Sequence, residues 1–141
     1  MKIYASRYGR GRLNPDIKTR DEILFGEYDP SAYSGGIRRF RGLDSVKLET
    51  LITEGFVYLG ERQNDGPSID ELLDFNEDWN DMYTFQGYAT NISREDYRIT
   101  IDSIQRKQPF TSSDEDELDD FNYFTEAADE VDDIEGFAWW D

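Results

Sequence analysis

Apolar side chains recur at helical spacing between residues 44 and 55. Asp44 or Ser45 can cap the start of this helix. Gly55 can end it, because glycine readily adopts the left-handed conformation that follows many helices. Residues 56–59 follow as a short apolar run and predict a strand. The apolar positions that predict the helix are Val46, Leu48, Leu51 and Ile52.

A second helix is predicted where Ser68 precedes Glu71 by three residues, which is the spacing of a capping box. The apolar residues after it carry the helix to about Trp79. Beyond this point the period changes to two, and residues 97–102 alternate between apolar and polar as a half-buried strand does. Residues 83–88 predict the strand before it, so the two form a hairpin.

The last third of the chain has the longest helical pattern. Ser112 or Ser113 can cap a final helix of about five turns. This period places one face of the helix on a core and leaves the other positions to solvent. The apolar face consists of Leu118, Phe121, Phe124, Ala128, Val131 and Ile134.

The first 42 residues carry weaker signals. Lys2 to Tyr8 predicts a strand, and residues 21–42 are expected to be mostly loop, because proline and glycine interrupt them. The whole pattern predicts one α+β domain with a small antiparallel sheet, about three helices and a long acidic C-terminal helix. Its segments are a basic glycine-containing part (1–42), helices with a hairpin (43–107), and the acidic helix with an aromatic tail (108–141).

Charge is distributed unevenly along the chain. The 141 residues include 15 basic and 32 acidic side chains, for a formal net charge of −17. Residues 1–60 contain ten basic and eight acidic side chains, net +2, and residues 61–107 contain five and eleven, net −6. Residues 108–141 contain thirteen acidic side chains and no Lys or Arg, net −13. Charge of one sign at this density opposes compaction, which indicates a function for the acidic end.

The acidic residues of the predicted final helix are the main candidates for contact with a partner. Like charges at i and i+4 cost about 0.2–0.5 kcal/mol per pair, and the helix dipole disfavours acids at the C-terminal end. Two tryptophans at the end of the segment either pack on the core or anchor an interface. The candidate partner-binding residues are Asp114, Glu115, Asp116, Glu117, Asp119, Asp120, Glu126, Asp129, Glu130, Asp132, Asp133, Trp139 and Trp140.

Helical spacing gives these carboxylates a geometric use. Side chains at i and i+3 or i+4 lie about 5–6 Å apart between Cβ atoms, which is comparable to the separation of successive phosphates along a DNA strand. A row of carboxylates can therefore occupy a groove built for a nucleic-acid backbone, although a solvated acidic face without a partner is the alternative. A secondary acidic patch consists of Asp70, Glu71, Asp74, Glu77, Asp78 and Asp81.

Two other functions are compatible with the sequence. The secondary acidic patch could hold Mg²⁺ in a carboxylate-metal nuclease, but the chain has no His as a general base and only Arg62 as a nearby cation. Arginines interleaved with Tyr and Phe in residues 7–41 could instead bind RNA by stacking, with the acidic helix serving only solubility. The same arginines could also neutralise the protein's own acids.

The absence of Cys and His excludes several kinds of chemistry. The chain can form no disulfide, no Ser-His-Asp triad and no Cys-His dyad. It also has no P-loop and no dinucleotide-binding fingerprint. We therefore expect no enzymatic activity, no metal and no cofactor. The chain begins without an apolar signal segment and has no apolar run near the roughly 20 residues of a membrane span, so we expect a cytoplasmic protein that binds no membrane.

The acid-rich segments 114–135 and 70–81, the aromatic residues beside them and the small size resemble the DNA-mimic anti-defence proteins of phages and mobile elements. These include anti-CRISPR and anti-restriction proteins. The resemblance implies a positively charged nucleic-acid-binding partner, a CRISPR nuclease or a restriction enzyme in the host cell, and no direct DNA binding. CRISPR effectors hold nucleic acid in cationic channels that carboxylates could occupy. Residues 1–60 depart from the pattern and would be scaffold or a different contact.

Overall fold

A computed structural model describes residues 12–141, and the strand expected from Lys2 to Tyr8 lies outside them. The described residues form four α-helices and five strands. The helices are α1 (Ile17–Phe25), α2 (Ser45–Thr53), α3 (Ile69–Asp78) and α4 (Glu115–Phe124), with a short 3-10 helix η1 (Pro30–Ala32) after α1. The strands are β1 (Ile37–Leu43), β2 (Tyr83–Thr90), β3 (Ile99–Arg106), β4 (Glu130–Asp132) and β5 (Phe137–Trp139).

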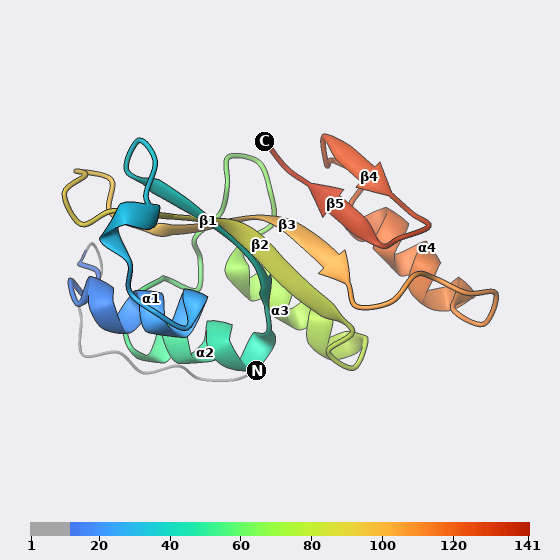
Figure 1. The fold of residues 1–141 in the computed structure, drawn as a ribbon. Coiled ribbons are helices and arrows are strands. Elements are labelled where there is room, and N and C mark those ends of the chain that lie inside the picture. The colour runs from blue at the N-terminus through green and yellow to red at the C-terminus, as the bar shows by residue number, and fades with distance from the viewer. Residues whose placement is uncertain (1–11) are drawn as a thin grey trace.

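All five strands belong to one antiparallel sheet in the order β1-β2-β3-β5-β4. Helices α1, α2 and α3 lie on one side of this sheet, and α4 lies beside the β4–β5 hairpin (Figure 1). The predicted α+β class with a small antiparallel sheet is therefore confirmed. The C-terminal strands join the sheet through β5, which pairs with β3.

Local sequence signals position the central elements as predicted. The Asp44 carboxylate caps α2 by accepting a hydrogen bond from the Lys47 backbone N–H at 2.8 Å. The Ser68–Glu71 capping box at the start of α3 is complete. One detail of the prediction is wrong, because residues 56–59 form no strand. Val46, one of the apolar positions that predicted α2, is 73% exposed.

The core fills the space between the sheet and these helices. It is made chiefly of aliphatic and aromatic side chains, and their burial supplies the main favourable free energy of folding. Helices α2 and α3 and strands β2 and β3 contribute most of it, with residues such as Leu48, Leu51, Ile52, Ile69, Leu72, Phe75, Tyr83, Phe85, Ile99 and Ile104.

The expectation that residues 21–42 are mostly loop is wrong, because they include the end of α1 and most of β1. Asp16 caps α1 by accepting from the Thr19 backbone N–H, and Gly26 ends it at a φ of +82°. The helix has no clear apolar stripe because it buries an ion pair, Arg20 with Asp21, at an Nε–Oδ1 distance of 3.0 Å. A search for apolar periodicity misses a helix of this kind.

The predicted five-turn C-terminal helix is also wrong. Helix α4 has ten residues and begins after Asp114, not after Ser112 or Ser113. It ends at Phe124, and the Thr125 hydroxyl donates to the Phe121 carbonyl at 2.8 Å. Beyond this point a helix would carry acids close to its C-terminal end, which the helix dipole disfavours.

The chain forms the β4–β5 hairpin instead. Asp132 accepts hydrogen bonds from the backbone N–H groups of Ile134 and Glu135, and Gly136 completes the turn at a φ of +76°. Pairing of β5 with β3 then buries Ala138 completely. Val131 and Ile134, expected in the core, are 42% and 70% exposed. Hydrogen bonding along the sheet and burial of the aromatic tail thus replace two turns of acidic helix.

The geometry of the β4–β5 turn predicts that Gly136→Ala strongly lowers the stability of the protein. An added Cβ would lie 2.4 Å from the Cβ of buried Arg106, in addition to the cost of about 1–2 kcal/mol for a side chain in the left-handed conformation. Gly26→Ala is the matched control, because Gly26 has a φ of +82° and open space around its Cβ position. Urea unfolding followed by circular dichroism should show that Gly136→Ala lowers the free energy of unfolding clearly more than Gly26→Ala does. Equal losses would contradict the turn geometry.

Candidate functional site

The structure brings the two acidic segments together, because α3 and α4 pack side by side through their aromatic residues. The rings of Phe75 and Phe124 stack with centroids 4.3 Å apart and planes 8° from parallel. Beside them, the indole N–H of Trp79 donates to the Asp120 carboxylate at 2.6 Å. Residues about forty positions apart in the sequence therefore form one surface.

Between the two helices lies a groove with a volume of about 310 Å³. We call it the α3–α4 groove. Among residues 12–141, its lining includes four carboxylates and three aromatic rings and no basic side chain. Arg62 lies at its edge, where it forms an exposed ion pair with Glu71 at 3.4 Å. The lining residues are Glu71, Asp74, Phe75, Asp78, Asp120, Tyr123 and Phe124.

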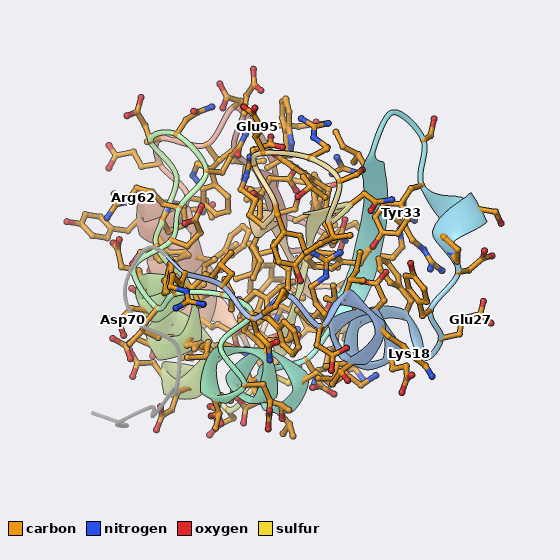
Figure 2. All side chains as sticks on the ribbon, turned by 90° about the vertical axis from the view of Figure 1, so that its left-hand side faces the viewer. Lys18, Glu27, Tyr33, Arg62, Asp70 and Glu95 are labelled. Carbon is orange, nitrogen blue, oxygen red and sulfur yellow. The ribbon has the colours of Figure 1, made fainter. Side chains whose placement is uncertain are left out.

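The secondary acidic patch lies mainly on α3. Asp70 is half-buried, and Glu71, Asp74, Glu77 and Asp78 are exposed. Asp81 is exposed after the end of the helix. Figure 2 shows Asp70 and Arg62 on the opposite side of the view from Lys18 and Tyr33, and Figure 1 shows α4 at the far side of the molecule from α1.

One predicted contact residue, Glu117, is an internal residue instead. It is 7% exposed and pairs in a bidentate manner with buried Arg106, with Oε2 2.7 Å from Nε and Oε1 3.1 Å from Nη2. The Tyr83 hydroxyl also donates to Glu117 at 2.7 Å. Burial raises the pKa of Tyr83, which keeps this donor protonated. This network attaches α4 to β2 and β3, so the expectation that Glu117 meets a partner is wrong.

The remaining acids of α4 divide into bound and free groups. Asp114 accepts from the Thr111 backbone N–H at 2.8 Å, and this hydrogen bond holds the pKa of the Asp114 carboxyl below its usual value. Asp120 accepts from Trp79. The carboxylates of Glu115, Asp116 and Asp119 are exposed, which leaves them available to a partner.

The other predicted acids lie on or near the hairpin rather than on a helix. Two of them support local structure: Asp129 accepts from the Asp141 backbone N–H at 2.7 Å, and Asp132 supports the β4–β5 turn. The exposed acids of this region are Glu126, Asp129, Glu130, Asp132, Asp133 and Glu135.

The two C-terminal tryptophans differ in their environment. Trp140 is 4% exposed and makes an edge contact with Phe124 at a centroid distance of 6.1 Å, so it is a core residue and not an interface anchor. Trp139 is half-buried in β5. The exposed aromatic residue of this region is Tyr123, at 77%. Tyr123 does not lie on the apolar face of α4, so plotting the sequence on a helix could have identified it as an exposed aromatic residue.

Three arginines in the described part of the basic N-terminal region contact the protein's own residues, whereas Arg12 and Arg41 are exposed. Arg20 pairs with Asp21, and the guanidinium of Arg38 lies 3.7 Å from the centre of the Phe25 ring. Arg39 forms an ion pair with buried Asp102 at 3.0 Å. These contacts fit the interpretation that the arginines neutralise and pack against the protein's own residues. Arg7 and Arg10 lie outside the described residues.

Residues 12–141 contain neither a metal-ion cluster nor a membrane-spanning helix. No group of three or more acidic side chains in this range has a geometry that could hold a metal ion. No helix in it is long and apolar enough to cross a membrane. No protein-family model, curated protein or solved structure matches the chain. The candidate site therefore rests on geometry and charge alone.

The buried network predicts that two neighbouring substitutions in α4 affect stability very unequally. Glu117→Ala should destabilise the protein by about 3–5 kcal/mol, because it leaves the Arg106 guanidinium buried without its carboxylate. Asp116→Ala should change stability by about 0.5 kcal/mol or less, since Asp116 is exposed. Chemical unfolding measures both. A stable Glu117→Ala variant would contradict the internal role of Glu117.

Proposed function

We propose that this protein binds the cationic nucleic-acid groove of a host nuclease through the acidic surface of α3 and α4, and thereby blocks DNA binding. A CRISPR effector is the favoured target and a restriction enzyme the second. The observation that carries the proposal is that both acidic segments line one groove, to which the described part of the chain contributes no basic side chain. Such a surface is complementary to a groove that binds phosphates.

The spacing of the free carboxylates supports mimicry of a phosphate backbone. Asp74 and Asp78 are exposed one turn apart on α3, and Asp116 and Asp119 are exposed three residues apart on α4. Neighbours at these spacings lie about 5–6 Å apart between Cβ atoms. Packed aromatic rings and a buried hydrogen bond hold the two helices in place before binding, which lowers the entropic cost of presenting their carboxylates together.

The internal contacts indicate which acids to substitute. Asp114, Glu117 and Asp120 each support the structure, so their loss would mix folding with binding. Glu115, Asp116 and Asp119 are exposed and carry charge on the same helix. They form the cleaner test set.

Competition with DNA predicts a dependence on the order of addition. The protein should inhibit a purified CRISPR effector strongly when added before target DNA, and much less when added afterwards, because the groove is then occupied. Cleavage of labelled DNA measures both orders. A restriction enzyme provides the second target class. Equal inhibition in both orders would reject mimicry and indicate an allosteric or catalytic mode.

Charge attraction predicts that the association rate falls as salt rises. Screening shortens the reach of the acidic surface from a Debye length of about 14 Å at 50 mM salt to about 4 Å at 500 mM. Interferometry at several salt concentrations measures the rate directly. An association rate that is independent of salt would contradict electrostatic steering.

The triple variant Glu115→Gln, Asp116→Asn, Asp119→Asn should weaken target binding about tenfold, since each exposed ion pair contributes about 0.2–1 kcal/mol. The control variant Glu22→Gln, Glu27→Gln, Glu54→Gln removes the same charge from exposed positions away from α3 and α4. It should bind nearly as well as the unchanged protein. Equal losses in the two variants would show that net charge, not the acidic surface, governs binding.

A further inference from the structure

The α3–α4 groove has an aromatic floor and an acidic rim. Stacked Phe75 and Phe124 contribute the apolar surface, and Phe75 is buried beneath it. Three carboxylates of α3 and one of α4 surround these rings. A groove of about 310 Å³ lies at the small end of ligand sites, which suits one long side chain better than an extended ligand.

Tyr123 is an unusual residue on this rim. Its side chain is 77% exposed although it is large and aromatic. Within the described part of the chain it stacks on no other ring and makes no side-chain hydrogen bond. An exposed tyrosine with a free face beside a groove is typical of an interface anchor. The ring face is electron-rich and attracts a cation.

Two carboxylates in the same groove are available as hydrogen-bond acceptors. Asp74 and Asp78 are exposed on α3, and among the described residues neither has an ion-pair or hydrogen-bond partner. Asp120, across the groove, already accepts from Trp79 and keeps further acceptor capacity. The groove therefore combines unpaired negative charge, an unused aromatic face and an apolar floor.

We propose that the α3–α4 groove receives a single arginine side chain from the partner protein. Its guanidinium stacks on Tyr123 and donates hydrogen bonds to Asp74 and Asp78, and its methylene stem lies over the stacked phenylalanines. The inference rests on the proposed function, because a groove that binds phosphates presents such arginines.

Arginine fits this groove better than lysine for physical reasons. A planar guanidinium matches a carboxylate through paired hydrogen bonds and stacks on an aromatic face at the same time. It is also less strongly hydrated than an ammonium group, so its transfer into an aromatic-lined groove is less costly. A phosphate or a nucleic acid is excluded as an occupant, because four carboxylates would repel it.

The test uses the full chain and two capped pentapeptides that differ only in a central arginine or lysine between glycines. Titration followed by two-dimensional amide NMR should show that the arginine peptide shifts signals around Asp74, Asp78 and Tyr123. The affinity of the lysine peptide should be lower by about threefold or more. Equal binding of the two peptides, or shifts spread evenly over all acidic segments, would overturn the proposal.

Variants separate the aromatic contribution from the charge. Tyr123→Leu should weaken the arginine peptide about threefold to fivefold, and Tyr123→Phe should retain most of the binding because it keeps the ring face. Asp74→Asn with Asp78→Asn should weaken it about tenfold. The control Glu22→Gln with Glu27→Gln removes the same charge from exposed positions away from the groove and should change binding less than twofold. Equal effects of the two double variants would contradict a specific site.

The peptide experiment needs no nuclease, so its result can contradict this inference without contradicting the proposed function. Arginine binding in the groove without inhibition of any nuclease would retain this inference for another arginine-bearing partner and overturn nuclease blocking. Inhibition that depends on order of addition, without arginine selectivity in the groove, would overturn this inference alone. All substituted positions are exposed, and circular dichroism verifies that each variant folds.

Discussion

The buried ion pair between Arg106 and Glu117 determines where the acidic surface lies. Arg106 ends β3 and Glu117 lies in the first turns of α4, so their bidentate contact fixes the helix against the sheet. A pair buried this deeply is costly unless its hydrogen bonds are complete. Here Tyr83 donates to the carboxylate, and the carbonyls of Gln108 and Pro109 accept from the guanidinium. Together with the Phe75–Phe124 stack and the Trp79–Asp120 hydrogen bond, this network fixes α4 relative to α3 and the sheet.

The same region shows how a strongly acidic chain divides its carboxylates between folding and binding. Acids such as Asp114, Asp120 and Asp132 accept hydrogen bonds inside the protein and stabilise turns or helix contacts. Others, such as Asp74 and Asp116, extend into solvent. The aromatic rings of Phe75, Phe124 and Trp140 lie under the acidic surface and supply the burial that offsets its self-repulsion. Rigidity and negative charge therefore occur together, as the proposed competition with DNA requires.

Elements with a complete local signal were predictable. The cap at Asp44, the box at Ser68 and the alternation in residues 97–102 each operate within a few residues, and α2, α3 and the β2–β3 hairpin formed as expected. The alternation was wrong on burial, because β3 begins at Ile99 and is buried on both faces rather than half-buried. Helix α1 was missed because Arg20 and Asp21 occupy its buried face, which periodicity in apolar residues does not detect. The candidate acids were found from composition, but Glu117 could not be separated from its exposed neighbours, because its partner Arg106 lies in a different element.

The sequence by itself determined the charge asymmetry, the lack of His and Cys chemistry, and the central elements, since these depend on composition or on contacts within one turn. Tertiary structure decided the fate of residues 125–141. The spacing of Val131 and Ile134 predicted a helix, but these residues lie in the β4–β5 hairpin instead. Hydrogen bonds between β3 and β5 and the burial of Ala138 and Trp140 stabilise this arrangement more than two further turns of acidic helix would. It also decided that α3 and α4 share a groove, since stacking of Phe75 on Phe124 joins residues that no local pattern connects.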